Sequence, residues 1–359
     1  MSASWGTQIE LTIFGESHGK AIGIVLGHLP AGIKLDMEEI KTQMLRRAPG
    51  QNKLSTARKE SDEVHIMSGL LDGYTTGAPL CAMIYNSDQH SKDYSLLKDH
   101  MRPGHSDYPA YVKYHGFNDI RGGGHFSGRL TAPIVFAGSV AKQILKQKGI
   151  FIGAHIQSIH TVYDEHFDVD LTEKDLEKLS ENLYPTLNPD QFSKMTEVIE
   201  EARKNQDSVG GKIECAIIGM EAGIGNPFFD SIESHLSPLL FSIPAVKSVS
   251  FGLHEDITEL YGHQANDLYY YDDDMKVKTM TNYNGGITGG ISNGMPIVFT
   301  VGIKPTPSIS QKQKTVNIQT KENTEIEIKG RHDPCIVPRA VVVVESMAAL
   351  GILDMINNV

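Results

Sequence analysis

Residues 339–357, RAVVVVESMAALGILDMIN, decide the fold because they are apolar on nearly every side of a helix. Valine fills positions 341–344 and a second apolar run follows at 347–353, so a helix here has to be buried. Residues 130–148 form another long, apolar, alanine-rich run that predicts a second buried helix. Helices of this kind must be covered on all sides, which favours two sheets that enclose them.

The other elements favour an α+β fold with antiparallel sheets. Strand-like runs occur at residues 8–13, 21–26, 63–70, 80–85, 151–160, 212–218 and 296–303. Further helices are predicted at residues 36–47 behind an Asp36 cap, at 170–205 with a break near Tyr184 and Pro185, and at 227–241. The strands do not alternate with helices as in a doubly wound sheet, and no linker-like tract divides the chain. We therefore expect one large domain over residues 1–359.

The composition excludes several classes of protein. A formal net charge of −11 argues against binding to nucleic acid or to an anionic membrane, although it permits a local basic pocket. Cys81, Cys215 and Cys335 are far apart, which indicates neither a disulfide framework nor a zinc site. No histidine pair has metal-ligand spacing, so no metal is expected. With no signal peptide before Trp5 and no run of about 18 apolar residues, a cytoplasmic location is expected.

A basic, glycine-rich stretch precedes the helix expected at residues 130–148. It reads MRPGHSDYPAYVKYHGFNDIRGGGHFSGR over residues 101–129 and contains three consecutive glycines at 122–124. A loop of this kind at a helix start gathers free backbone N–H groups and cationic side chains, which is how a phosphate site is built. A polar surface loop is the alternative, but the density of arginine and histidine beside glycine favours a site.

Other loops carry candidate chemistry as well. The turn GESHG at residues 15–19 follows a strand, and its glycines would let a ligand approach while His18 supplies a proton near neutral pH. A solvent-facing turn is the alternative. Residues 51–62 are polar without a periodic apolar face, which predicts a mobile loop over a site. Arg47 stands at a helix C-terminus, where the helix dipole alone could account for a cation.

Patterns alone thus indicate a cytoplasmic enzyme that acts on a phosphorylated anion, with its site in loops. A flavin or nucleotide-phosphate enzyme, a metal site and a non-enzymatic binding module all remain open. A Rossmann fingerprint has poor support, because the glycines at 122–124 do not follow a convincing strand. Those at 285–294 precede a strand instead of opening a helix.

Seven short motifs together resemble those of the chorismate synthase family. They are GESHG (15–19), PG with RKESD (49–62), RPGHSDY (102–108), RGGG (121–124), the glycine cluster at 286–294, KPT (304–306) and RHDPC (331–335). Each is weak alone, but they occur in the family's order from Thr7 to about Glu345. The set is therefore specific and covers nearly the whole chain.

The resemblance implies a β-α-β sandwich of antiparallel sheets around helices, assembled as a homotetramer. It implies conversion of the small phosphorylated substrate 5-enolpyruvylshikimate 3-phosphate to chorismate by anti-1,4 elimination of phosphate, in aromatic amino-acid biosynthesis. Reduced FMN is required without net redox change, because the C–H bond is not acidic and an electron lent by the flavin assists departure of phosphate. A flavin-dependent oxidoreductase, a metal-dependent phosphate lyase and a non-catalytic flavin-binding protein are the rival functions.

The matching motifs also assign roles to individual residues. His18 would donate a proton near the departing phosphate, and His105 would donate to the reduced flavin. Asp333 would act with the flavin in removing the substrate proton, while Ser17 and Ser127 would support the hydrogen bonds of the site.

The same motifs imply the binding residues. The flavin would be held by His125, Phe126, Ser127, Pro244, Ala245, Gly289, Lys304, Pro305, Thr306, Pro307, Ser308 and Arg331. The anionic groups of the substrate would be held by Arg47, Lys53, Arg129 and Arg339. Arg47 also matches a position associated with NADP. Two sources of reducing power therefore stay open: NADPH used by the chain itself, or an external reductase.

The loop at residues 121–131 departs from the family pattern. It reads RGGGHFSGRLT where relatives commonly read RGGGRSSARET, so His125, Phe126, Gly128 and Leu130 are the changed positions. A side-chain contact at position 125 would be weaker and pH-dependent, because histidine is mostly neutral at pH 7. A backbone contact would survive. Lys53 stands where many members have a second arginine, which weakens bidentate binding there.

Overall fold

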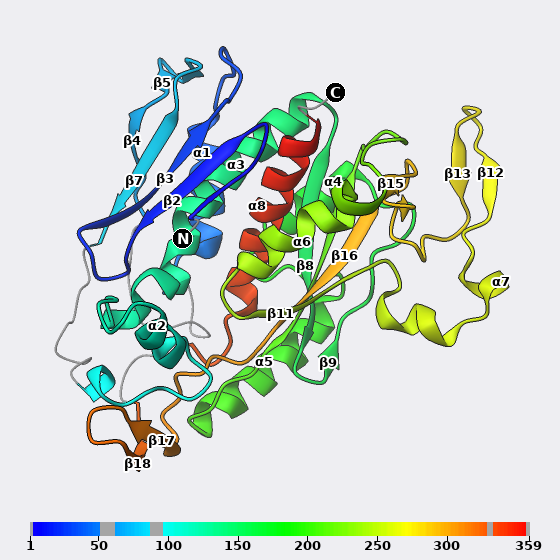
Figure 1. Ribbon diagram of the computed structural model, residues 1–359. Coiled ribbons are helices and arrows are strands. Elements are labelled where there is room, and N and C mark those ends of the chain that lie inside the picture. The colour runs from blue at the N-terminus through cyan, green and yellow to red at the C-terminus, as the bar shows by residue number, and fades with distance from the viewer. Residues whose placement is uncertain (1–2, 51–61, 87–95, 329–332, 357–359) are drawn as a thin grey trace.

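Two five-stranded antiparallel sheets enclose a layer of helices in the computed structural model, which describes residues 3–50, 62–86, 96–328 and 333–356 (Figure 1). The first sheet has the order β1 (Ser4–Trp5), β2 (Glu10–Gly15), β3 (Ala21–Gly27), β7 (Leu80–Tyr85), β4 (His65–Ser68). The second has the order β11 (Val246–Phe251), β16 (Ile297–Ile303), β10 (Gly211–Ile218), β8 (Phe151–Ile159), β9 (Val162–Tyr163). Every pairing within them is antiparallel, as predicted.

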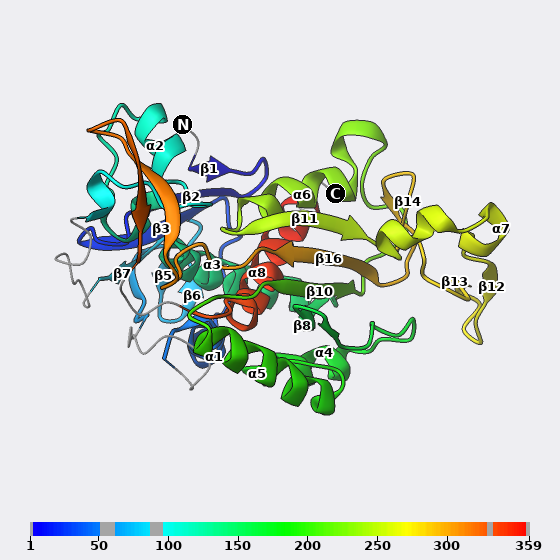
Figure 2. The same cartoon turned by 90° about the horizontal axis from the view of Figure 1, so that it is seen from below.

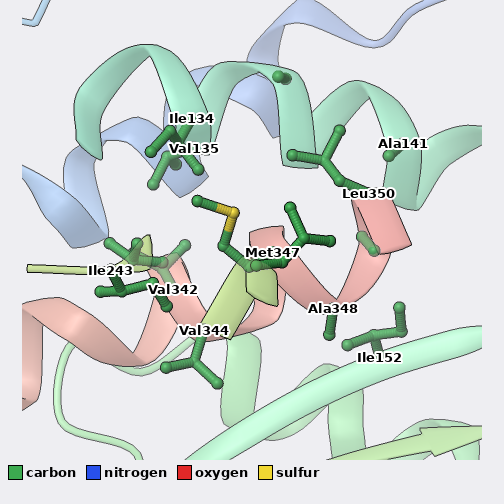
Figure 3. Packing of buried hydrophobic residues seen from close by; sticks show 14 of the residues in the cluster. Ile134, Val135, Ala141, Ile152, Ile243, Val342, Val344, Met347, Ala348 and Leu350 are labelled. Carbon is green, nitrogen blue, oxygen red and sulfur yellow. The ribbon is translucent and has the colours of Figure 1, made fainter. Parts of the chain in front are cut away.

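The two predicted buried helices form the centre of the layer. Helix α3 (Thr131–Gln147) packs against β3 and β7 of the first sheet, and α8 (Val337–Ile356) packs against β8 and β10 of the second. Figure 3 shows Met347 and Leu350 of α8 in the space between the two helices. Helices α1 (Met37–Arg47) and α6 (Ile232–Ser242) flank this pair. The expected sandwich is confirmed.

The two central helices approach each other so closely that glycine is required. A Cβ atom added at Gly138 of α3 would lie 2.2 Å from Cβ of Ser346 and 2.4 Å from its Cα. Any larger residue would have to push the helices apart, since core packing leaves no slack for an extra methyl group at this distance. The crossing point of α3 and α8 is therefore fixed at Gly138.

Two carboxylates interrupt the apolar sequence of α8, and both are compensated. Burial raises the pKa of Glu345, but Arg46 and Lys142 outweigh it and lower the pKa to about 2. The Arg46 guanidinium donates to both carboxylate oxygens at 2.8 Å, and the Lys142 ammonium donates at 2.8 Å. Asp354 accepts from three successive backbone N–H groups at residues 7–9, the last at 2.8 Å from Ile9. These contacts tie α8 to both α1 and the start of β2.

Helices cover the outer face of the second sheet too. On β10, Ile213 and Ile217 face the central helices, whereas Ala216 packs beneath α4. The acidic segment predicted as a broken helix is indeed two helices, α4 (Glu173–Ser180) and α5 (Pro189–Lys204). Both bury an apolar side, so this segment is a covering layer with a solvated outer surface.

One predicted boundary is wrong. The helix expected at residues 227–241 begins only at Ile232, because Pro227 is extended and Ser231 caps the helix with its side chain accepting from the Ser234 N–H at 3.0 Å. The Asp36 cap of α1 is confirmed by its hydrogen bonds from the N–H groups of Glu38 and Glu39, each 3.0 Å.

Short elements complete the chain. They are β5 (Leu70–Leu71), β6 (Tyr74–Thr75), α2 (Asp107–Lys113), α7 (Gly262–Ala265), β12 (Tyr269–Tyr271), β13 (Val277–Thr279), β14 (Ile287–Thr288), β15 (Ile291–Ser292), β17 (Gln313–Asn317) and β18 (Glu322–Ile326). Hairpin β12–β13 projects from one end of the molecule, and β17–β18 lies beside α2 at the other (Figures 1 and 2). None of the helices in the described part of the chain is both long and apolar enough to span a bilayer.

Candidate active site

The GESHG turn and the glycine-rich loop meet at one end of the first sheet. The turn joins β2 to β3, whose register pairs Gly15 with Ile22. The backbone N–H of Ser17 donates to the carbonyl oxygen of Gly124 at 3.1 Å, which docks the turn on the loop. Two segments about 100 positions apart in the sequence are therefore joined directly by their backbones.

Two glycines of the loop lie against the two predicted catalytic histidines. Gly122 has a φ of 61°, and a Cβ atom there would lie 2.3 Å from Cε1 of His18. Gly123 has a φ of 103°, and a Cβ atom there would lie 3.5 Å from Nε2 of His105. The positive φ angles favour glycine, and at Gly122 the space requires it as well. The structure thus brings His18 and His105 to neighbouring positions along one turn.

The partner of His18 fixes how its ring carries a proton. His18 is only 4% exposed, and its Nδ1 lies 3.1 Å from Oγ of Ser17. That hydroxyl donates its single proton to the carbonyl oxygen of Arg121 at 3.2 Å, so Nδ1 must be the donor to Ser17. The neutral ring then has its lone pair at Nε2, which is the nitrogen that can accept and release a proton.

An aspartate orients His105 in the same way. Its Nδ1 lies 2.7 Å from Oδ1 of Asp107, and the Arg102 guanidinium donates to both oxygens of that carboxylate at 2.7 and 2.8 Å. Burial raises the pKa of Asp107, but the bonds from Arg102 and His105 outweigh it and hold the pKa well below its usual range. A charged Asp107 keeps the proton of His105 on Nδ1, so Nε2 is turned toward Gly123.

The predicted flavin segment at residues 304–308 lies beside this histidine loop. The Lys304 ammonium donates to the carbonyl oxygen of Gly104, and the Arg102 guanidinium donates to Oγ of Ser308 at 3.4 Å. The backbone N–H of Lys304 donates to the carbonyl oxygen of Ala245 at 3.0 Å. Of the predicted flavin contacts, Ala245 and the 304–308 segment are therefore next to each other and to the loop of His105.

Two predicted substrate arginines share one buried carboxylate. Asp62 accepts from Nη1 of Arg47 at 2.5 Å and from Nη1 of Arg129. Burial raises the pKa of Asp62, but the two guanidinium groups outweigh it and lower the pKa. Among the described residues, two guanidinium groups face one carboxylate, so Arg47, Arg129 and Asp62 together sum to one positive charge.

Arg339 connects this group to the predicted base. Its Nη1 donates to Oδ2 of Asp333 at 2.6 Å, and its Nε donates to the carbonyl oxygen of Arg47 at 2.9 Å. Arg47 in turn reaches Oγ1 of Thr131, the first residue of α3, at 3.2 Å. The N-termini of α3 and α8 therefore both open into the cluster, and their dipoles add to its positive potential.

Several predicted residues lie apart from the cluster. Gly289 is in the turn between β14 and β15, beyond the opposite end of β16 from Lys304 (Figures 1 and 2), and the seven residues of that strand span about 20 Å. A cavity of about 820 Å³, lined by Tyr269, Thr288 and Gly294 among others, lies at that far end too. Lys53 and Arg331 are outside the described residues, as is the loop predicted at residues 51–62 except for Asp62.

The positions near residue 125 that differ from the family pattern make contacts of their own. The His125 ring is hydrogen-bonded through Nδ1 to the carbonyl oxygen of Gly15 at 2.9 Å, so it helps to hold the GESHG turn. Phe126 is 40% exposed beside Tyr114, with 6.2 Å between ring centroids. Ser127 caps the short turn that follows it by accepting from the N–H of Arg129 at 3.2 Å.

Two residues of the site had no role assigned from the sequence. Asp62 belongs to the 49–62 motif, which assigns it no role, and no pattern in the sequence marks Asn86. The Asn86 side chain reaches both the GESHG turn and Arg129. A lone asparagine after a strand has no sequence signature, so only the pairing of β7 with β3 could have revealed it.

Two histidines, each oriented through Nδ1, lie near two arginines that share a buried carboxylate, an arrangement suited to acid–base chemistry on an anionic ligand. The chorismate synthase family model matches residues 9–356. The chorismate synthase of Methanocaldococcus jannaschii is 44% identical over 364 residues, covering 98% of this chain and 95% of its own. That of Pyrococcus abyssi is 46% identical over 353 residues, covering 97% and 96%.

A solved structure agrees with these sequence matches. A crystal structure of chorismate synthase superimposes with a TM-score of 0.76 at 26% identity, covering 98% of this chain and 92% of the other. The chain belongs to the chorismate synthase family. Its enzyme class is therefore that of the lyases, and the rival oxidoreductase and binding-protein functions are not favoured.

Proposed function

We propose that this protein converts 5-enolpyruvylshikimate 3-phosphate to chorismate by anti-1,4 elimination of phosphate. The observation that carries the proposal is the placement of His18 and His105 along the turn at Gly122 and Gly123, beside the buried arginine cluster. The elimination breaks one C–H bond and one C–O bond of the substrate. It therefore needs a group that removes a proton and a group that protonates the leaving phosphate.

The residues of the chain divide that work. Nε2 of His18 delivers the proton to the departing phosphate, and Ser17 holds the ring through Nδ1. Asp333 accepts the substrate proton at its carboxylate, which Arg339 orients through a 2.6 Å hydrogen bond. His105, oriented by Asp107, protonates or donates a hydrogen bond at Nε2. Ser127 positions Arg129 at the start of α3.

The three arginines contribute differently to binding of the anionic groups of the substrate. The side chains of Arg47 and Arg129 are 3% and 7% exposed and both bind Asp62, whereas that of Arg339 is 21% exposed. Arg339 is therefore the direct ligand, and the other two supply positive potential from behind it. Lys53 is a further ligand proposed from its motif position.

The residues near His105 fit a flavin phosphate and ring system. Oγ1 of Thr306 is buried and has no hydrogen-bond partner among the described residues, and the Lys304 cation lies in the same segment. We assign reduced FMN to residues 304–308, Pro244, Ala245, residues 125–127 and Arg331. When bound, reduced FMN supplies an electron that assists loss of phosphate and is then recovered. Gly289 joins this set only if a neighbouring subunit supplies it.

The wider setting follows from the same proposal. The chain acts as one catalytic domain over residues 1–359, as a cytoplasmic homotetramer, with NADPH as the source of electrons for the flavin. Aerobic assays with NADPH alone, with and without an added flavin reductase, separate intrinsic from external reduction. Turnover only with the added enzyme would assign the reduction elsewhere.

The proposed reaction has a direct test. Anaerobic protein with photoreduced FMN, the substrate and no added metal is expected to release phosphate and chorismate in equal amounts. Protein that is folded by circular dichroism yet inactive under these conditions would rule the proposal out. Phosphate release that requires an added divalent metal would point to the metal-dependent lyase instead.

A further inference from the structure

We infer that Asn86 is a positioning residue that holds the turn carrying His18 in the geometry needed for proton transfer. The inference rests on the proposed function, because it assigns His18 as the acid. Asn86 touches neither the His18 ring nor any other group to which a proton transfer has been assigned. It acts on the backbone that carries the ring, and it is itself held by Arg129.

The sheet register explains why this asparagine reaches the turn. Strand β7 pairs with β3 so that Tyr85 lies opposite Ala21, and Asn86 is the next residue along. Its backbone N–H donates to the carbonyl oxygen of Lys20 at 3.2 Å, which continues the pairing by one step. The side chain of Asn86 is therefore delivered beside the turn that joins β2 to β3.

The amide group holds both ends of the segment that carries His18. Its Nδ2 donates to the carbonyl oxygen of Glu16 at 3.0 Å and to that of Gly19 at 2.9 Å. These two carbonyl groups flank residues 17–18. Both protons of the amide nitrogen are used, so the turn cannot rotate without losing at least one of them.

The third contact fixes the orientation of the amide. Oδ1 of Asn86 accepts from Nε of Arg129 at 3.1 Å. Reversing the amide would place its oxygen against two carbonyl oxygens and its nitrogen against a guanidinium donor, so only one orientation satisfies all three partners. Arg129 is a rigid partner because the buried carboxylate of Asp62 holds it.

The same contacts continue to the other end of the site. Asp62 also binds Arg47, whose carbonyl oxygen accepts from Arg339, which binds Asp333. One continuous network thus runs from the His18 turn to the proposed base. Asn86 is the last member of this network, and through Asn86 the network holds the turn that carries His18.

Geometry of this kind affects the rate more than binding. A displacement of about 1 Å in a reacting group lowers catalysis by roughly 100-fold, because proton transfer depends steeply on distance and angle. Asn86→Ala removes both hydrogen bonds to the turn. Asn86→Asp preserves the size of the side chain and its contact with Arg129 but removes the two donors.

Asn188 supplies a control in a different part of the molecule. Its Oδ1 accepts from the N–H of Asp190 at 3.0 Å, and its Nδ2 donates to Oε1 of Glu165 at 3.1 Å. It caps the start of α5, where no residue has been assigned to the site. Asn188→Ala therefore removes two hydrogen bonds of a side-chain amide without touching the site.

The test compares Asn86→Ala, Asn86→Asp and Asn188→Ala in the full-length protein with photoreduced FMN. Both Asn86 variants are expected to lose about 10- to 100-fold in kcat with KM within about threefold, and Asn188→Ala to stay within about twofold. Equal kcat for Asn86→Asp and wild type would overturn the inference. The aspartate variant retains the volume of the side chain and so covers the case in which the alanine variant does not fold.

A spectroscopic measurement tests the inference without turnover. In protein with ¹³C-labelled histidine, the Cε1 signal of His18 is assigned with a His18→Gln variant. The Asn86 variants are expected to move that signal, whereas Asn188→Ala leaves it in place. An unmoved His18 signal in Asn86→Ala would contradict a positioning role. If wild type makes no chorismate, the proposed function fails, and this measurement still decides the effect of Asn86 on His18.

Discussion

His105 and His155 have the same local chemistry but lie in different surroundings. Each places Nδ1 beside an aspartate, at 2.7 Å from Asp107 and at 3.2 Å from Asp164. Nε2 of His105 faces Gly123, but Nε2 of His155 binds Glu214 at 2.9 Å in a place that is 0% exposed. A carboxylate at one nitrogen orients a histidine. Whether the other nitrogen is already hydrogen-bonded decides whether the ring can take part in proton transfer or only stabilises the fold.

The residues around His155 indicate that it has a structural role. Glu214 also binds Nδ1 of His166 at 2.6 Å, and Asp164 accepts from the N–H of Leu187 at 2.6 Å. The group therefore joins β8 and β10 to the segment that leads into α5. It lies on the outer face of the second sheet, on the other side of that sheet from α8.

The largest effect is expected from His105→Ala. Loss of a general acid or hydrogen-bond donor at the site should lower kcat by about 10²- to 10⁴-fold, because no neighbouring group can replace Nε2. The free energy of unfolding should change by less than about 1 kcal/mol, since Asp107 keeps its pairing with Arg102. Anaerobic turnover and urea unfolding measure the two effects. Full activity in this variant would remove His105 from the proposed site.

His155→Ala should give the reverse result. It leaves two buried carboxylates without their shared cation, which costs about 3–5 kcal/mol in the free energy of unfolding. The kcat of the folded fraction should stay within about twofold. His160→Ala, in the exposed turn just after the same strand, is the control and should cost less than about 0.5 kcal/mol. Equal stabilities of the two variants would show that the buried group contributes nothing.

The pH dependence of stability should carry the signature of the His155 group. Burial raises the pKa of Glu214, but the bonds from His155 and His166 outweigh it and lower the pKa to about 2, below its unfolded value of about 4.3. Its contribution is present above pH 4.3 and is lost as pH falls toward 2. Burial lowers the pKa of His155, but Asp164 and Glu214 outweigh it and raise the pKa. That contribution is present below about pH 6.5 and is lost as pH rises through the folded value.

Unfolding of wild type and Glu214→Gln by urea across pH 3 to 9 measures this effect. The difference in free energy of unfolding should be greatest between about pH 4.5 and 6.5 and shrink on both sides. A difference that is constant with pH would mean that the group is not ionised in the folded protein.

The smallest effect is expected at Gly123, which faces the available edge of His105. Gly123→Ala should cost about 1–2 kcal/mol of stability because of its positive φ, and should lower kcat about threefold to tenfold through contact with the ring. Gly149→Ala is the matched control: its φ is 77°, and no atom lies within 4 Å of an added Cβ. It should show the same loss of stability with unchanged kcat. A similar kcat in both variants would place the reacting edge of His105 elsewhere.

The sequence predicted those parts of the molecule that depend on local pattern. The valines at 341–344 and the alanine-rich run at 130–148 required burial, and that alone led to two enclosing sheets. The glycines at 122–124 also predicted an unusual backbone, and the structure gives all three a positive φ. These signals are local because helix periodicity and glycine conformation depend on neighbouring residues.

What the sequence could not predict depends on strand pairing. Asn86 matters only because β7 lies beside β3, and Asp62 only because Arg47 and Arg129 converge on it. Only the RPGHSDY motif separates His105 from His155 in the sequence, since the carboxylate that engages the second nitrogen of His155 is on another strand. Contacts between distant segments are set by topology, which no local pattern encodes.

The crossing of α3 and α8 at Gly138 determines how far a small rotation of either helix moves the residues of the site. Thr131 and Arg339 each lie about two helical turns, or roughly 10 Å, from that crossing point. A rotation of one helix against the other by about 5° would shift these residues by about 1 Å, which is the displacement that costs roughly 100-fold in rate. The absence of a side chain at Gly138 sets how closely α3 and α8 approach each other. It thereby sets the distance between the arginines and the proposed acid–base groups.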